Sequence, residues 1–323
     1  MKIGLDTAPA ALRETYFQHL ASVLARYAPE HEYVIGTEAN DGVDLYHGFR
    51  SSLPLSVHLR RVPSVMTVPN LNFLRYPHLY TFAERLFVLT LYRRALRRAG
   101  RVITVSAPAR EELSERLNID PSKIEVMVPL AVPAPHGNPS QAELEHVRRK
   151  YALPEHFILM IGTVESRHNH QAVFAALAGG VVCGRRTAWS DYLLGYARAR
   201  RIAARVDFIY ELTPSDLPAL FRLARVFAYL PDADAEASVV PVVEALRAGL
   251  PMVLSDTQVN REAAGEAAAY VRPEARGEVL AALENALEDV SWRRTMQERE
   301  RRRAELFSEY AVAERLMQIY TSL

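Results

Sequence analysis

Two glutamates eight residues apart, Glu236 and Glu244, are the strongest candidates for ligand-binding side chains in this sequence, and Pro241 lies between them. Proline fixes φ at about −65° and is favoured in the first turn of a helix. We therefore expect Glu236 on a loop and Glu244 about three residues inside the helix that follows. There the positive end of the helix dipole would keep the Glu244 carboxylate ionised and ready to accept hydrogen bonds.

An acidic pair just before these glutamates offers a different chemistry. Asp232 and Asp234 form a D-x-D pattern after an apolar segment, and such carboxylates can bind Mg²⁺ or Mn²⁺ together with a diphosphate. We favour ordinary loop acids, because an alternating α/β pattern precedes the pair and the two glutamates follow at once. His168 and His170, with no cysteine nearby, make a poor zinc site. The sequence therefore predicts no metal and no cofactor.

Arginine, histidine and backbone amides must bind any anion in the second half of the chain, because only three lysines occur and none lies beyond residue 150. Arg167 is the first candidate, since a guanidinium grips phosphate with two parallel hydrogen bonds. His168 beside it is only partly protonated near neutral pH. Arg185 and Arg186 are further candidates. Glycine is scarce at 14 residues, which disfavours a glycine-rich phosphate loop.

Short apolar segments alternate with longer amphipathic ones, which is typical of parallel sheets covered by helices. The predicted strands are 2–6, 32–36, 43–46, 64–68, 102–105, 123–128, 157–162, 181–184, 206–210, 226–229, 252–255 and 269–271. The predicted helices are 9–27, 78–99, 107–117, 141–151, 169–177, 189–203, 214–223, 241–248, 260–264, 276–288, 292–306 and 309–321. Segment 129–139 has four prolines and predicts a domain linker.

The fold that this pattern predicts is α/β, with two Rossmann-like, doubly wound domains facing a cleft. We place the domains at 1–135 and 136–305, with residues 306–323 packing back on the first. The 39 basic and 38 acidic residues give a net charge of +1 and no global field for nucleic acid. One cysteine excludes an internal disulfide. With no apolar run of ~18 residues and no signal peptide, we expect a cytoplasmic protein.

Five segments, taken together and in order, resemble the retaining glycosyltransferases of the GT-B fold, in the group 1 or family 4 class. They include Arg101-Val-Ile-Thr-Val-Ser106 with the strand after it, the strand and loop of Phe157 to His170, and the E-x7-E signature from Glu236 to Glu244. The remaining segments are 217–231 and 245–256. The resemblance covers most of the chain.

This resemblance implies a metal-independent transfer of a hexose from a nucleotide diphosphate sugar in bacterial cell-surface polysaccharide assembly. Glu236 would bind the hydroxyls of the donor sugar near the reacting carbon, and Glu244 would accept hydrogen bonds from the ribose. Backbone amides of Ser238, Val239 and Val240 would face the phosphates. The nucleotide base, whether of UDP, GDP or ADP, stays open.

Other positions of the family pattern carry changed residues here. The family's phosphate-loop basic pair corresponds to Thr163 and His168. Its catalytic His-Asp pair corresponds to Pro69 and Asn70, and Asn70 can hydrogen-bond but cannot carry charge. The loop after the first strand, which begins at Thr7, has no glycine. A catalytically impaired GT-B protein that serves as a binding partner or scaffold is therefore the alternative function.

The first domain would bind the acceptor, a glycan or a lipid-linked glycan. Thr7, Ser106 and His47 are the candidate acceptor-side residues, and we expect His47 to follow a strand and point into the cleft. The basic, amphipathic segment 85–101 could contact an anionic membrane surface. A covering helix with solvent-facing arginines is the alternative that we favour for this segment.

Overall fold

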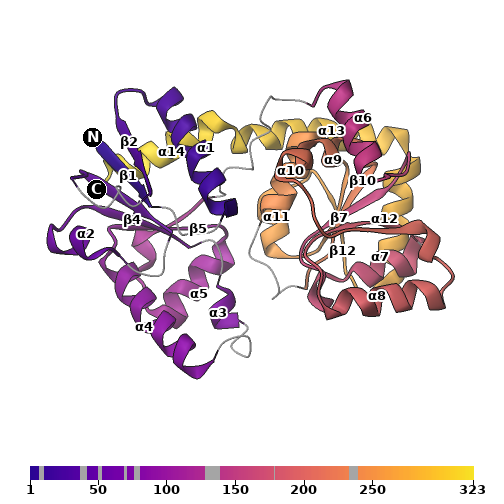
Figure 1. Ribbon diagram of the computed structural model, residues 1–323, viewed down its shortest axis with the longest axis horizontal. Helices are drawn as coiled ribbons and strands as arrows, with labels where there is room; N and C mark the ends of the chain where they lie inside the picture. Colours follow the sequence, from indigo (N-terminus) through magenta and orange to yellow (C-terminus); the bar gives the residue numbers. More distant parts are fainter. Residues whose placement is uncertain are drawn as a thin grey trace. The chain divides into compact units, whose positions relative to one another are not determined.

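The computed structural model describes residues 1–6, 11–36, 42–49, 53–68, 71–75, 81–127, 139–177, 179–232 and 239–323. The chain forms two compact units. Unit 1 comprises Met1–Pro133 and Leu306–Leu323, and unit 2 comprises Ala134–Glu305. The division between residues 133 and 134 falls within the proline-rich segment. Each unit holds its own six-stranded parallel sheet (Figure 1).

The sheet of unit 1 has the strand order β2-β1-β3-β4-β5-β6. All of its pairings are parallel. Every residue of the central strand β4 is buried, as expected for a parallel sheet with helices on both faces. The strands are β1 (Lys2–Asp6), β2 (Glu32–Ile35), β3 (Leu45–Gly48), β4 (Ser64–Val68), β5 (Arg101–Thr104) and β6 (Ile124–Val126).

Helices cover both faces of this sheet (Figure 1). Leu24 of α1 and Leu316 of α14 belong to one buried cluster, whereas Leu96 of α4 and Leu113 of α5 belong to another. The last segment of the chain is therefore part of the core of unit 1. The helices are α1 (Ala11–Tyr27), α2 (Leu55–Leu59), α3 (Asn72–Arg75), α4 (Phe82–Arg98), α5 (Ala107–Leu117) and α14 (Glu309–Thr321).

The sheet of unit 2 has the order β12-β11-β10-β7-β8-β9, again all parallel. Its strands are β7 (Ile158–Ile161), β8 (Gly180–Cys183), β9 (Val206–Ile209), β10 (Val226–Tyr229), β11 (Met252–Ser255) and β12 (Ala269–Val271). Its helices are α6 (Gln141–Lys150), α7 (His170–Leu177), α8 (Ala188–Ala199), α9 (Leu217–Leu223), α10 (Val240–Ala248), α11 (Gln258–Ala264), α12 (Arg276–Glu288) and α13 (Val290–Ala304).

The predicted α/β fold class is confirmed, and several predicted elements have the observed bounds, including β4, β10, α5 and α12. Helix α5 starts where Ser106 accepts a hydrogen bond from the Ala109 amide and ends at Asn118, which has a left-handed conformation. The strand predicted at 43–46 is observed two residues later, as β3 at Leu45–Gly48. His47 therefore lies within a strand rather than after it.

Candidate functional site

The topology of unit 2 has a switch point at a defined place in its sheet. From β7 the chain moves outward through β8 and β9, and it then returns to add β10 on the other side of β7. Loops that follow such neighbouring strands diverge at the carboxyl edge, and ligands of doubly wound folds bind there. The candidate donor site therefore comprises the loop after β7, the segment after β10 and the beginning of α10.

Two glycines let the backbone of this site pack closely. Gly162, directly after β7, has φ +143°, and a Cβ there would lie 3.3 Å from the ring of His168. A Cβ on Gly184, after β8, would lie 1.8 Å from the carbonyl oxygen of Gly162. These two positions bring the loop after β7 against the end of β8.

Hydrogen bonds join the loop after β7 to the segment after β10. Asn169 donates from Nδ2 to the carbonyl oxygen of Leu230 at 3.0 Å and to Oδ1 of Asp232 at 2.6 Å. The Asp232 amide in turn donates to the carbonyl oxygen of Arg167 at 2.9 Å. Asp232 thus ties the two loops together. Asp234 lies outside the described residues.

Arg167 lies in a short 3-10 turn, Ser166–His168, at the end of this loop. Its Nε donates to Oε2 of Glu165 at 2.5 Å, and the two side chains are 20% and 31% exposed. The guanidinium therefore faces a carboxylate at a half-open position. An incoming diphosphate would compete with Glu165 for the same N–H groups.

The two histidines of the loop are buried rather than open to a ligand. His168 is 6% exposed, and its Nδ1 hydrogen-bonds the carbonyl oxygen of Thr163. His170, at the start of α7, is 3% exposed, and burial together with the charge of His168 lowers the pKa of its imidazole to about 3. The pair Thr163 and His168 thus supports the loop through a backbone contact. Arg185 is exposed beyond β8.

Helix α10 follows the segment after β10 and begins without a side-chain cap. Val239 is its N-cap residue and Val240 its first residue, and Val239 is 1% exposed. Glu244 is 7% exposed and is the fifth residue of the helix, so it lies beyond the first turn in which we expected it. The field of the helix dipole is therefore weaker at Glu244 than the sequence suggested.

Four of the predicted site residues, Glu236, Ser238, Asn70 and Thr7, lie outside the described residues. Two further predictions for unit 1 concern positions that the structure places in the interior. Ser106 is fully buried as the cap of α5.

His47 is 1% exposed and does not point out of the sheet, which corrects our expectation. Its Nδ1 lies 2.7 Å from the hydroxyl of Tyr320, and its Nε2 lies 2.7 Å from Oγ1 of Thr67. Burial lowers the pKa of this imidazole to about 3, so it is neutral near pH 7. His47 therefore joins β3 to β4 and α14.

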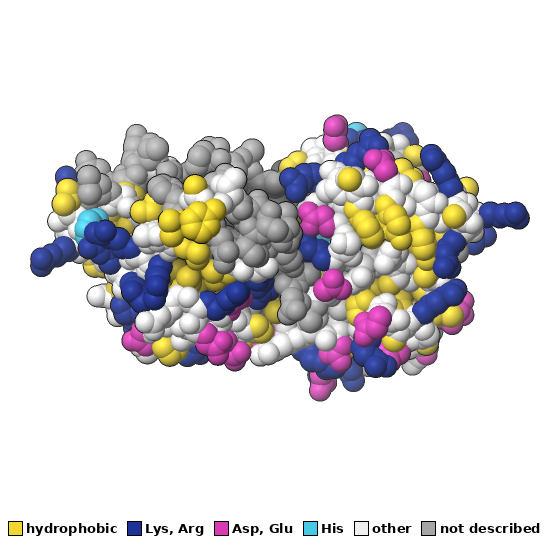
Figure 2. Space-filling view, turned by 90° about the horizontal axis from the view of Figure 1, so that it is seen from below, with side chains coloured by type: hydrophobic (Ala, Val, Ile, Leu, Met, Phe, Trp, Pro, Cys, Tyr) yellow, Lys and Arg dark blue, Asp and Glu magenta, His cyan; other side chains and the backbone are white. Residues whose placement is uncertain are grey.

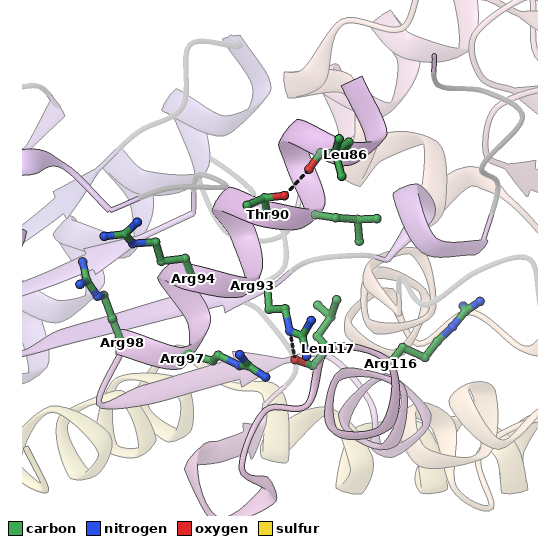
Figure 3. Close-up of a pocket in the computed structure, with 9 residues that line it drawn as sticks. Leu86, Thr90, Arg93, Arg94, Arg97, Arg98, Arg116 and Leu117 are labelled. Atoms are coloured by element: carbon green, nitrogen blue, oxygen red, sulfur yellow. Dashed lines mark hydrogen bonds between the residues drawn. The ribbon is translucent and has the colours of Figure 1, made fainter. Parts of the chain in front are cut away.

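Unit 1 carries a groove of about 650 Å³ along α4 and the end of α5 (Figure 3). Arg93 reaches across it from Nε to the carbonyl oxygen of Leu117 at 3.0 Å. Nearby on α4, Phe82 and Leu86 are 82% and 56% exposed. Basic and hydrophobic side chains also lie side by side in the space-filling view of unit 1 (Figure 2). The lining is Leu86, Leu89, Thr90, Arg93, Arg94, Arg97, Arg98, Arg116 and Leu117.

In the described part of the chain, no helix is both long enough and apolar enough to cross a membrane. No group of three or more His, Cys, Asp or Glu side chains in that part is arranged to hold a metal ion.

Sequence reasoning missed Glu165 and Asn169. Both follow strand β7 within one loop, a position at which polar residues of doubly wound folds commonly meet ligands. The local signal in the sequence is the residue type, because asparagine tolerates the left-handed conformation. Asn169 adopts this conformation, with φ +53°. Its bonding partners are about 60 residues away and could not be read from the sequence.

Two family models match the chain. Residues 145–303 match glycosyl transferases group 1, and residues 14–129 match glycosyltransferase family 4. The chain is 26% identical over 275 residues to O-antigen chain mannosyltransferase B of Escherichia coli, covering 82% of this chain and 70% of the relative. It is 23% identical over 230 residues to O-antigen chain mannosyltransferase RfbU of Salmonella typhimurium, covering 68% of this chain and 60% of that relative. The chain therefore spans less than two thirds of the length of the second relative.

Solved structures share the fold at low sequence identity. HepE from Anabaena, in complex with UDP, is similar with a TM-score of 0.75 and 14% identity, over 100% of both chains. WaaG, a glycosyltransferase involved in lipopolysaccharide biosynthesis, is similar with a TM-score of 0.68 and 14% identity, over 99% of this chain and 100% of that one.

Proposed function

The chain belongs to the glycosyltransferases of the group 1 and family 4 class, and from that membership we propose that it transfers a hexose from a nucleotide diphosphate sugar to a glycan or lipid-linked acceptor. The two related proteins are O-antigen mannosyltransferases, and HepE structures contain UDP or UDP-glucose. Mannose and glucose are both hexoses, which supports this donor class. Assembly of a cell-surface polysaccharide on the cytoplasmic side of the membrane is the setting that we propose.

The observation that carries this proposal is the switch point between β7 and β10, where hydrogen bonds hold the loop after β7 against the segment after β10. Arg167 lies in that loop, and the uncapped beginning of α10 supplies backbone amides, starting at Val239. A diphosphate gains negative charge as the glycosidic bond breaks, and amides and a guanidinium stabilise that charge. We propose a retaining transfer in which these groups serve in place of a metal ion.

The remaining roles extend the same proposal. Glu236 would contact the hydroxyls of the donor sugar, and Glu244 would accept hydrogen bonds from the ribose. Asn70 would orient the acceptor or donor sugar by hydrogen bonding at the position where related enzymes use an ionisable pair. Ser238 and Val240 would contribute amides, and Arg185 would add a second cation near the phosphates.

Calorimetric titration of the whole chain with UDP, GDP and ADP tests the donor site. We expect one of the three to bind at micromolar strength, and the same affinity in EDTA, because the proposed site uses no metal. A transfer assay with the matching mannose and glucose donors then identifies the sugar. If none of the three nucleotides binds, the alternative function of a GT-B protein that acts as a scaffold is supported.

The groove on α4 suits an acceptor that is held at an anionic membrane surface. Exposed Phe82 and Leu86 can enter the interface, while the arginines of the helix attract lipid phosphates. Each arginine near such a surface contributes about 1 kcal/mol, so charge reversal at Arg94 should weaken vesicle binding at least fivefold. Sedimentation with phosphatidylglycerol vesicles measures this, and Arg301→Glu in unit 2 is the matched control. Equal loss in both variants would show a general charge effect.

A further inference from the structure

A small cavity of about 130 Å³ lies in unit 2, at the edge of the sheet where β10 and β11 begin. Ala224 and Arg225 directly precede β10, and Leu250 and Pro251 directly precede β11. The strands are parallel, so this is the amino edge, opposite the carboxyl edge that holds the candidate donor site. The cavity therefore plays no part in the proposed binding of the nucleotide sugar.

Three arginines line this cavity, together with Gln297. Arg222 donates from Nη1 to the carbonyl oxygen of Ala248 at 3.1 Å, at the end of α10. Arg293 donates to the carbonyl oxygens of Ala286 and Leu287, at the end of α12. These two guanidiniums each satisfy the carboxyl end of a helix, where cations are favoured.

Arg225 differs from the other two. Its backbone amide donates to the carbonyl oxygen of Phe157 at 2.9 Å, which fixes the position of its main chain. Its guanidinium makes no hydrogen bond or ion pair with any described residue. A guanidinium carries five N–H donors in a planar fork that matches the oxygens of phosphate.

The charges around the cavity are not balanced by acids in its wall. Within the described residues, its lining contains three arginines and neither aspartate nor glutamate. Burial and the nearby positive charge of Arg225 lower the pKa of Arg293, and only Asp289 acts in the opposite direction. Two arginines that repel one another at a cavity favour an anion between them.

The small volume favours a small ligand. At about 130 Å³ the pocket is well below the roughly 300 Å³ or more that is typical of sites for larger ligands, and Arg222 and Gln297 in its wall are exposed. A tetrahedral oxyanion offers oxygens that match the donors of guanidinium groups. We propose that this cavity binds free inorganic phosphate, with Arg225 as the main donor and Arg222, Arg293 and Gln297 around it. The bound anion would connect the start of β10, the end of α10 and helix α13.

Titration of the whole chain with inorganic phosphate, against potassium chloride of equal ionic strength, tests the proposal. We expect phosphate to bind and to raise the unfolding temperature of unit 2 reported by tryptophan fluorescence, because a ligand that binds the folded state stabilises it. Arg225→Gln should raise the phosphate dissociation constant at least tenfold, the size of a lost charged hydrogen bond. Arg294→Gln, an exposed arginine of α13 outside the cavity, should change it less than twofold.

Two further experiments test whether the response to phosphate comes from the donor site or from lipid phosphate. Arg167→Gln should leave phosphate binding unchanged, whereas loss in Arg167→Gln with retention in Arg225→Gln would place the anion in the donor site and overturn the proposal. Glycerol 3-phosphate and phosphatidylglycerol vesicles should bind more weakly than free phosphate. Binding to the vesicles alone would contradict free inorganic phosphate as the ligand. Circular dichroism of each variant without phosphate checks that the fold persists. Equal responses of Arg225→Gln and Arg294→Gln would also contradict the site.

Discussion

Arg167 is paired with Glu165 in the loop of the candidate donor site, so a bound diphosphate must displace the Glu165 carboxylate from the guanidinium. Arg167→Ala should weaken nucleotide diphosphate binding by about 1.5–3 kcal/mol, the size of a charged hydrogen bond. The corresponding nucleoside should lose much less, since it has no phosphate. Calorimetry with both ligands measures the difference. Equal losses would mean that Arg167 maintains the loop instead.

The two glutamates of the E-x7-E motif should affect different quantities. Glu244 is buried in α10, so Gln is the better replacement because it keeps the side-chain volume. Glu244→Gln should raise the dissociation constant of the free nucleotide about tenfold, or ~1.4 kcal/mol. Glu236→Gln should leave that constant nearly intact and slow sugar transfer by at least roughly 10²-fold, if it acts on the transition state.

Nucleotide affinity and transfer rate are measured on both variants and on the parent. A folded Glu244→Gln protein with parental nucleotide affinity would contradict the ribose contact. An unchanged transfer rate in Glu236→Gln would show that the motif does not take part in sugar transfer, and it would support the scaffold function.

At the scale of elements, local patterns predicted most of what the structure contains. Helix α5 was predictable in full, because Ser106 and Pro108 mark its start. Strand β3 was misplaced by two residues, since apolar Val43 begins the run before strand pairing with β1 starts at Leu45. The five-residue helix α2 was missed because it is too short to show a period. The site loops depend on bonds such as Asn169 to Leu230, which no local pattern encodes.

Helix α13 contains a buried acid that makes unit 2 sensitive to pH. Glu300 is 0% exposed, and burial raises the pKa of its carboxyl to about 8. Its unfolded pKa is about 4.3, so the folded state holds the extra proton between these values. The free energy of unfolding should therefore fall as pH rises from about 4.5 to 8, by up to about 1.4 kcal/mol per pH unit.

Glu300→Gln should remove this fall, because an amide does not titrate. Urea unfolding followed by tryptophan fluorescence is the measurement, and it reports on unit 2 because both tryptophans, Trp189 and Trp292, belong to that unit. Buried His170, whose pKa is lowered to about 3, contributes a slope of opposite sign below pH 6.5, and this contribution cancels when the variant is compared with the parent. Parallel pH profiles for the two proteins would contradict a buried, protonated Glu300.

At the scale of the whole molecule, the chain leaves unit 1, builds unit 2 and returns to complete the first core. Helix α14 contributes Val312, Leu316 and Ile319 to the cluster that also holds β1 and α1. The hydroxyl of Tyr320 on α14 also lies 2.7 Å from Nδ1 of His47 on β3. Unit 1 therefore depends on residues that are synthesised after all of unit 2.

Removal of residues 306–323 should accordingly unfold unit 1 and spare unit 2. The apolar surface that α14 covers would be exposed, and burial of each such side chain stabilises by about 1.5–3 kcal/mol, which together approaches the stability of a whole domain. We expect the truncated chain to lose part of its helical circular dichroism while the unfolding transition seen by tryptophan stays at the parental urea concentration. Tyr320→Phe removes only the hydroxyl contact to His47, so it should lower the stability of unit 1 by about 1–3 kcal/mol and leave the fold intact. A truncated chain with full parental circular dichroism would show that unit 1 folds without its last helix.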